Sequence, residues 1–466
     1  MNAQPIPMTA PASVYQQRRA RLGKALDQPL VVCAGYAPAR NYPSNPHPFR
    51  AGSSYLYLGG PPIEGAALLI EPGTDGDDGC TLLRPPPGPD DALWMGPSPS
   101  DAALAAAAGL AQARVVEPEM IELLLAGRAG TAVSPPCAAT HAWLGSLRVP
   151  PASDADLLAI INLRLIKDEH ELAAMRRAAE VTVEAHRAAL GAAGPGRHEA
   201  DIAAAYHAVL VARQCRPSFT PITTVRGETL HVQSYTNRLK NGDLLLIDAG
   251  AEEPGGYACD VTRTAPVGGE WNPTQRHLYD TVLRAQRETI AACVPGRRFR
   301  EVHDLAARII CEGLVQAELL RGDPSELAAR YAHTLFFCHG LGHLIGLDVH
   351  DMEDFGDLTG YAPGRSRRPE FGNKFLRLDR DLDTGMCVTI EPGVYFVPAL
   401  WERQDLVGPF ADVVNRPAVD ALLAGNFGGI RIEETICVRE SGQPEVLTEA
   451  LPNDADAVAE MIGTRV

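Results

Sequence analysis

The sequence lacks the marks of several large classes of protein. It has no stretch of about 18 consecutive apolar residues, so it predicts no membrane-spanning helix, and it does not open with a basic and then apolar export signal. It has no dense Lys/Arg run and its formal net charge is −16, which argues against nucleic acid or an anionic membrane as a partner. We therefore expect a cytoplasmic protein.

Closely spaced cysteines are also missing. The ten cysteines are scattered singly, without a CxxC motif or another short spacing. This distribution indicates reduced, buried thiols rather than a disulfide framework, and it argues against a structural zinc site held by thiolates. The sequence also shows no repeat of the length found in solenoid proteins.

The chain is long enough for two domains. At 466 residues it exceeds the usual size of a single domain. The segment RVPPASDAD at 148–156 is rich in turn-forming residues and marks the join. We therefore expect domains at 1–155 and 156–466.

The two domains are predicted to differ in fold class. In the first, helical patterns alternate with short apolar runs, which indicates a smaller α/β domain. In the second, helices precede a hairpin, two more helices follow and strands return in the last third, an order typical of α+β folds with an antiparallel sheet. The predicted helices are 13–26, 101–114, 163–190, 199–213, 274–293 and 300–320, and the predicted strands are 30–35, 54–60, 66–72, 241–250, 257–267, 386–396 and 430–440.

Four of the predicted strands in the second domain carry an acid in an otherwise apolar run. Any one of them alone could be a strand-end acid that faces solvent or pairs with an arginine. Burying four together would be prohibitive without cations. The acids are Asp248 in LLLIDAG, Asp260 in YACDVT, Glu391 in VTIEPG and Glu433 in IRIEET.

This set of acids predicts a metal site. Four negative charges would balance two divalent ions, and two bridging carboxylates would let the ions share a hydroxide. Ligation dominated by oxygen favours Mn²⁺ or a similar hard ion. Such a pair is suited to hydrolysis near neutral pH. The segment CHGLGHLIGLDVHD at 338–351 offers a nitrogen ligand, and its glycines argue against a helical zinc site.

These motifs resemble those of the pita-bread metallopeptidases that act at Xaa-Pro bonds, prolidase and aminopeptidase P. The resemblance covers 163–450 and, more weakly, 13–145. It implies a curved antiparallel sheet in the second domain, a homodimer, and two divalent ions, with Mn²⁺ favoured over Co²⁺ or Zn²⁺. The segment between the two aspartates is one residue longer than in these enzymes, which a hairpin tip should tolerate.

The resemblance also assigns roles to single residues. It implies metal ligation by Asp248, Asp260, His343, Glu391 and Glu433, with Asp260 and Glu433 bridging the two ions. By itself each remaining histidine could be an ordinary polar or core residue. The further catalytic candidates are His231, His339 and His350, which would contact substrate and the tetrahedral intermediate, together with Glu391 as a proton donor, for which a histidine relay is the alternative.

Two more residues are candidates for substrate binding, Tyr395 and Arg431. The arginine would hold Glu433 in place, as partners of metal ligands often do. The alternatives are a packed aromatic ring and a structural ion pair.

The choice of substrate rests on the third quarter of the chain. The segment FLRLDRDLDTGM at 375–386 resembles the prolidase segment whose arginine holds the free carboxylate of a dipeptide, and Arg377 falls on that position. The alternative for this residue is a surface arginine in a charged loop. The long connection from Glu391 to Glu433 also resembles prolidase.

We therefore predict an Xaa-Pro dipeptidase. The alternative is an Xaa-Pro aminopeptidase that acts on longer proline-containing peptides. From another class, a pita-bread protein that binds without catalysis is also considered, as is a phosphotriesterase side activity. Matches at all five ligand positions argue against the binding protein.

Overall fold

The computed structural model describes residues 6–73 and 79–464. By its internal contacts the chain divides into two compact units, Met1–Leu165 and Ile166–Val466. Over the part of the chain that is described, no helix is both long enough and apolar enough to cross a membrane.

The division between the units lies later than the expected join at 155, because helix α7 (Asp154–Arg164) packs within the first unit. Thr131 donates a hydrogen bond of 3.0 Å to Asp156 near the start of this helix. At its end, Arg164 donates one of 3.1 Å to the hydroxyl of Ser54.

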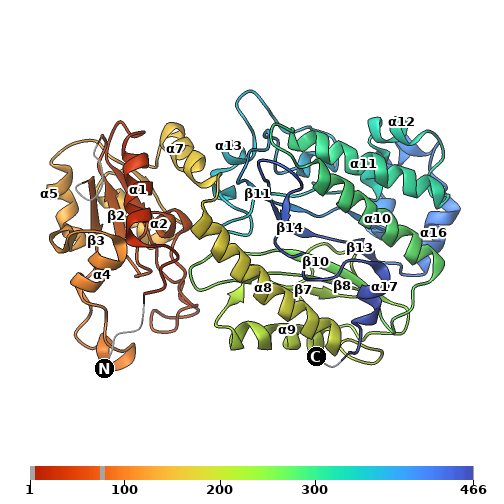
Figure 1. Cartoon of the computed structure of the whole chain (residues 1–466), viewed down its shortest axis with the longest axis horizontal. Coiled ribbons are helices and arrows are strands. Elements are labelled where there is room, and N and C mark those ends of the chain that lie inside the picture. The colour runs from red at the N-terminus through yellow and green to blue at the C-terminus, as the bar shows by residue number, and fades with distance from the viewer. Residues whose placement is uncertain (1–5, 74–78, 465–466) are drawn as a thin grey trace. The chain divides into compact units, whose positions relative to one another are not determined.

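The first unit contains a five-stranded mixed sheet with strand order β4-β3-β2-β1-β5. Strands β2 and β3 of this sheet are labelled in Figure 1. β1 pairs antiparallel with β2 and parallel with β5. This combination of one mixed sheet with helices is the α/β organisation that the sequence predicts. The strands are β1 (Leu30–Cys33), β2 (Ala67–Ile70), β3 (Cys80–Leu83), β4 (Val115–Val116) and β5 (Thr131–Val133), and the helices before α7 are α1 (Ala12–Gly23), α2 (Ser53–Tyr57), α3 (Asp91–Trp94), α4 (Asp101–Ala108), α5 (Ile121–Leu125) and α6 (Ala138–Ser146).

Two predictions for this unit are wrong in detail. The predicted strand at 54–60 is helix α2, and the buried Tyr55 on it donates a hydrogen bond to the carbonyl of Pro61. The predicted helix at 101–114 ends at Ala108, because Gly109 adopts a left-handed conformation with φ of 69°.

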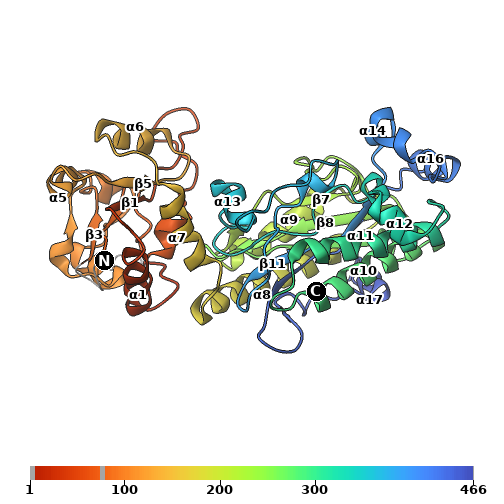
Figure 2. The same cartoon turned by 90° about the horizontal axis from the view of Figure 1, so that it is seen from above.

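In the second unit, long helices pack on an antiparallel strand system. The side chains of α8 and α9 form one core with strand β8, which includes Leu190, Tyr206 and Ile247. Helices α8, α10 and α11 lie along one side of the strands (Figure 2). The helices are α8 (Glu169–Ala192), α9 (Glu199–Ala212), α10 (Pro273–Ala292), α11 (Phe299–Gln316), α12 (Pro324–Ala329), α13 (Asp357–Gly360), α14 (Pro398–Trp401), α15 (Gln404–Val407), α16 (Arg416–Ala424) and α17 (Ala455–Glu460).

The helix predicted at 163–190 is in fact two helices, α7 and α8. Helix α8 starts afresh after Asp168, whose side chain accepts a 3.0 Å hydrogen bond from the backbone of Glu171. The Glu171 carboxylate accepts one in return from the backbone of Asp168, which completes a capping box.

Every strand pair in the second unit is antiparallel, among the described residues, as predicted. β8 lies between β7 and β10, β14 between β11 and β15, and β12 pairs with β13. The backbone of Glu433 donates to the carbonyl of Thr262 at 3.1 Å. This hydrogen bond connects the segment between β13 and β14 to strand β10. The strands are β6 (Arg216–Pro217), β7 (Ile222–Thr224), β8 (Leu244–Ala249), β9 (Ala251–Glu252), β10 (Val261–Pro266), β11 (Cys387–Ile390), β12 (Gly393–Tyr395), β13 (Gly429–Arg431), β14 (Glu434–Cys437) and β15 (Glu445–Val446).

The histidine-rich segment at 338–351 is not helical. It lies directly against β11, where a Cβ atom on Gly342 would be 1.9 Å from the carbonyl oxygen of Thr389. A Cβ atom on Gly340 would likewise be 2.8 Å from the Cα atom of Leu376. The glycines therefore allow a close backbone approach that fixes His339 and His343 on either side of them.

Candidate metal centre

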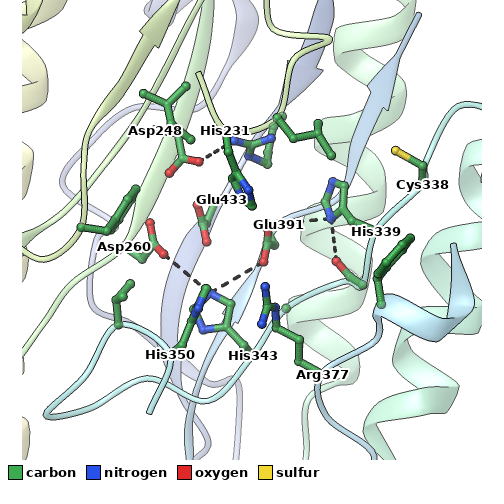
Figure 3. Close-up of a pocket in the computed structure, with 18 of the residues that line it drawn as sticks. His231, Asp248, Asp260, Cys338, His339, His343, His350, Arg377, Glu391 and Glu433 are labelled. Carbon is green, nitrogen blue, oxygen red and sulfur yellow. Dashed lines mark hydrogen bonds and ion pairs between the residues drawn. The ribbon is translucent and has the colours of Figure 1, made fainter. Parts of the chain in front are cut away.

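A cavity of about 570 Å³ in the second unit brings the four predicted acids together with the histidines (Figure 3). Asp248, Asp260 and Glu433 are buried, with 8%, 5% and 2% of their surface exposed, and His343 is equally enclosed at 2%. Three carboxylates and one imidazole from separate parts of the chain thus point into one enclosed space.

The strand architecture explains why these acids face the cavity. Only Asp248 lies within a strand, since Asp260 directly precedes β10. Glu391 and Glu433 lie at matching breaks, between β11 and β12 and between β13 and β14. At these breaks the chain passes between the β11–β14 ladder and the β12–β13 ladder. The two acids therefore do not follow the regular alternation of side chains between the two faces of a sheet.

His343 presents one ring nitrogen to the acids. Its Nδ1 lies 3.0 Å from the carbonyl oxygen of Leu344, to which it donates, so Nε2 carries the free lone pair. This Nε2 is 3.6 Å from Asp260 and 3.8 Å from Glu391. Ligand atoms of His343, Asp260 and Glu433 all lie within 4.8 Å of one another, which is a spacing suited to one metal ion.

The electrostatics of the cluster are unfavourable in the absence of a cation. Burial, together with the nearby charges of Asp248 and Glu391, raises the pKa of Asp260 to about 7. Burial and neighbouring acids also raise the pKa of Glu433 well above its ordinary value. Burial lowers the pKa of His343, but Asp260 and Glu391 outweigh it and the net shift is upward. The acids therefore hold protons that a cation would displace.

The donor atoms of the cluster fit divalent cations. Asp248 Oδ1 and Asp260 Oδ1 are both buried, and neither has a hydrogen-bond partner. Buried carboxylate oxygens without partners are costly unless a cation coordinates them. A donor set of carboxylates with one imidazole suits hard divalent ions.

Arg431 organises one side of the centre. It donates to Asp248 through Nη2 and, at 3.2 Å, to Thr262 through Nε. The Thr262 hydroxyl in turn donates to Glu433 at 2.8 Å. The sequence predicts that Arg431 holds Glu433; in the structure the arginine donates directly to Asp248 and is linked to Glu433 by the hydroxyl of Thr262.

Tyr395 and His339 continue this hydrogen-bonded chain. The hydroxyl of Tyr395 accepts from Arg431 Nη1 at 2.8 Å and lies 2.8 Å from His339 Nε2, to which it donates. His339 Nδ1 is 2.7 Å from the carbonyl of Gly340. Burial and the charge of Arg431 lower the pKa of His339 to about 3, so the ring is neutral. Tyr395 is fully buried and lies behind His339 rather than in the cavity wall.

The other candidates line the cavity itself. His231 is exposed, and the rings of His350 and His343 are 4.3 Å apart and nearly perpendicular. Arg377 points toward the space beside Glu391 (Figure 3). The cavity wall thus includes each predicted site residue except Tyr395.

Some supporting residues were missed from the sequence. Thr389 accepts a hydrogen bond from the backbone of His343 at 3.1 Å, and Thr435 accepts one from the backbone of Asp260 at 3.2 Å. Threonines in strands are common, so only their position beside the acids could have marked them. Glu353, which accepts a hydrogen bond from Arg377, carries no recognisable sequence signal.

Comparison with known protein families gives two matches. Residues 173–440 match the family described as metallopeptidase family M24. Residues 15–128 match the aminopeptidase P N-terminal domain.

Curated relatives match along most of the chain. A probable Xaa-Pro aminopeptidase of Talaromyces marneffei is 32% identical over 441 residues, which cover 89% of this chain and 88% of the relative. A probable Xaa-Pro aminopeptidase of Aspergillus fumigatus is 30% identical, with 86% of each chain covered.

Solved structures are similar over nearly the whole chain. Proline aminopeptidase P II from Yersinia pestis superposes with a TM-score of 0.77 at 29% identity, covering 97% of this chain and 99% of that one. Aminopeptidase P from E. coli with the inhibitor Pro-Leu gives a TM-score of 0.79 at 26% identity, covering 97% and 98%. The similarity thus extends over both units.

Proposed function

The chain belongs to metallopeptidase family M24, and from that premise we propose that it is an Xaa-Pro aminopeptidase, which removes the first residue of peptides whose second residue is proline. The predicted fold is confirmed: the second unit has the pita-bread fold, and an aminopeptidase P N-terminal domain precedes it. The observation that carries the proposal is the cluster of four acids, three of them buried, with His343 in one cavity.

This proposal departs from the dipeptidase favoured by the sequence motifs. The relatives and solved structures described above are named as aminopeptidases, which supports the alternative better. Arg377, on which the dipeptidase prediction depended, already donates a hydrogen bond to Glu353. For Arg377 to bind the free carboxylate of a dipeptide, that carboxylate would have to compete with the side chain of Glu353 for the guanidinium.

We propose that Asp248, Asp260, His343, Glu391 and Glu433 hold two divalent ions, with Mn²⁺ favoured over Co²⁺ or Zn²⁺. Such ions, when bound, polarise a carbonyl and supply a nucleophile from water near neutral pH. A homodimer stays a prediction. A role in binding without catalysis is disfavoured, because all five ligand side chains face one cavity.

The residues of the cavity fit the demands of a proline substrate. The proline nitrogen carries no hydrogen, so a peptidase cannot grip it by the usual backbone hydrogen bond. The neutral imidazole of His350 can orient the substrate by a hydrogen bond instead, since burial lowers its pKa, whereas both ring nitrogens of His339 already have protein partners. Glu391 in the cavity wall is the candidate donor of the proton that the departing proline nitrogen takes up.

A second candidate is the Xaa-Pro dipeptidase. One observation favours it: Arg377 lines the cavity and leaves 39% of its side chain exposed. A guanidinium there has further N–H groups that could bind the carboxylate of a dipeptide.

One experiment separates these functions. The protein loaded with Mn²⁺ is incubated with Ala-Pro, Ala-Pro-Ala and, as a control without proline, Ala-Ala-Ala. An aminopeptidase cleaves the proline tripeptide with the larger kcat/KM, whereas faster cleavage of Ala-Pro identifies the dipeptidase. Lack of cleavage of either proline peptide, with metal bound, contradicts both and favours the binding protein.

A further inference from the structure

Glu353 lies beside the cavity wall, outside the residues discussed as catalytic. Its Oε2 accepts a hydrogen bond from Arg377 Nη1, and the same oxygen is 3.6 Å from His350 Nδ1. Arg377 and His350 both line the cavity. One carboxylate oxygen therefore lies against two side chains that face the substrate space.

The backbone before Glu353 is strained. Met352 has a φ of 60°, a left-handed conformation that is uncommon for residues other than glycine, and it is completely buried. The hydroxyl of Thr359 donates to the Met352 carbonyl at 2.8 Å and helps to fix this conformation. A left-handed conformation at a residue other than glycine is unfavourable, and it marks positions where the placement of a side chain matters.

The second carboxylate oxygen of Glu353 also has an unusual environment. Glu353 Oε1 is buried and has no hydrogen-bond partner. It borders a small cavity of about 40 Å³, which Arg377 and Arg367 also line. An unsatisfied carboxylate oxygen destabilises a fold, so packing alone does not account for an acid at this position.

Two other charged side chains near Arg377 have ion-pair partners of their own, whereas Glu391 lies beside it in the cavity wall. Asp351 forms a buried ion pair with Lys167 at 2.9 Å. Arg367 pairs with Asp357 at 2.7 Å. Within the described part of the chain, Glu353 is thus the carboxylate in ion-pair contact with Arg377.

From these contacts we propose that Glu353 is a positioning residue that sets substrate length by acting through Arg377. It neutralises and occupies the guanidinium at the cavity wall, so the free carboxylate of an Xaa-Pro dipeptide gains little from binding there. In a longer peptide the C-terminal carboxylate lies farther from the cleaved bond than Arg377 does. The pairing of Arg377 with Glu353 therefore does not weaken the binding of a longer peptide. This inference rests on the proposed function, and it explains why an arginine in the wall is compatible with an aminopeptidase.

The test compares substrates that differ in one charge. Steady-state kinetics with Mn²⁺ are measured on Ala-Pro, on its amide Ala-Pro-NH₂, and on Ala-Pro-Ala, for the wild type and Glu353→Gln. We expect the substitution to raise the ratio of kcat/KM for Ala-Pro over the amide by roughly three- to tenfold, mainly through a lower KM. The gain should vanish in Glu353→Gln combined with Arg377→Met.

Matched controls address folding and general charge effects. Glu370→Gln removes one exposed carboxylate from the same part of the chain and should leave the ratio unchanged. Glu353→Ala provides a second variant if the first does not fold, as judged by its thermal midpoint. An unchanged or lowered ratio in the folded Glu353 variants overturns the inference. Failure of the wild type to cleave any proline peptide would instead overturn the proposed function.

Discussion

His339 and His343 belong to one short segment but have different partners. The Nε2 atom of His343 faces Asp260 and Glu391, whereas that of His339 faces the hydroxyl of Tyr395. The glycine between them, Gly342, allows the segment to lie against β11 without becoming a helix. At the level of single residues, the structure therefore gives the predicted metal ligand His343 and the neighbouring His339 different surroundings.

This separation predicts opposite behaviour for two alanine variants. His343→Ala should lose bound metal and activity together, because it removes the one imidazole donor of the cluster. His339→Ala should retain metal but lower kcat by roughly 10- to 100-fold, because it breaks the hydrogen-bonded chain from Arg431 through Tyr395 beside the acids. Metal analysis of dialysed protein and peptide hydrolysis provide the two measurements.

Retention of metal by His343→Ala would contradict the assignment. His303→Ala is a matched control, since this histidine is buried in the same unit but is not in the wall of the cavity. It should leave the metal content intact.

At the scale of elements, the strand pair β11 and β14 supports the metal centre. Thr389 and Thr435 lie opposite each other in this ladder. The backbone of Thr389 donates to the carbonyl of His343 at 2.9 Å, and the hydroxyl of Thr435 donates to the carbonyl of Asp260 at 2.8 Å. One cross-strand pair thus holds the backbones of two predicted ligands.

Replacing Thr435 by valine tests this support. The change keeps the shape of the side chain but removes both hydrogen bonds to the backbone of Asp260. We expect metal affinity to fall by roughly 10-fold, as is typical when a partner of a ligand is lost. Titration against a competing chelator measures the effect.

Thr289→Val is the matched control, because this buried hydroxyl bonds to the carbonyl of Ala285 within its own helix. It should leave metal affinity unchanged. Equal affinities for Thr435→Val and the wild type would show that the ladder does not position Asp260.

The elements themselves were only partly predictable. Strands such as β8 have continuous apolar runs with turn signals beside them, and the sequence predicts these well. The short apolar run at 54–60 was also predicted as a strand, but its first half lies in helix α2, since a short apolar run does not distinguish a strand from a buried helix. The break before α8 was visible in the capping pattern of Asp168 and Glu171 but was overlooked.

The site was more predictable than its supports. Acids in apolar runs are costly, so Asp248 and Glu433 stand out in a sequence. The hydrogen-bond partners of Arg431 depend on tertiary packing. Nothing in the local sequence indicates whether this arginine donates to Asp248 or to Glu433. The contact between Glu353 and Arg377 joins two loops and likewise has no local signature.

At the scale of the whole molecule, metal binding should control the stability of one unit. The metal cluster lies entirely in Ile166–Val466. Chains with two units need not unfold in one step, so calorimetry can resolve separate transitions. An excess of Mn²⁺ of about 100-fold over Kd adds about 2.7 kcal/mol to the free energy of unfolding of the unit that binds it.

The effect of pH on this stability follows from the raised pKa values. The pKa of Asp260 rises from its ordinary value of 3.8 to about 7, so the folded metal-free protein binds a proton that the unfolded chain has released. Its free energy of unfolding should therefore fall as pH rises between these values. His343 acts in the same direction, because its pKa is raised and its contribution is lost as pH rises through that pKa.

Metal reverses this dependence, because the ions displace the protons and bind more tightly as pH rises. We therefore expect the difference in thermal midpoint between Mn²⁺-loaded and chelator-treated protein to grow from about pH 5 to about pH 8. The Asp260→Asn variant should show a smaller increase, since it carries no titrating proton at that position. Scanning calorimetry at several pH values measures both. A midpoint difference that does not change with pH would mean that metal binding does not displace protons from the acids of the cavity.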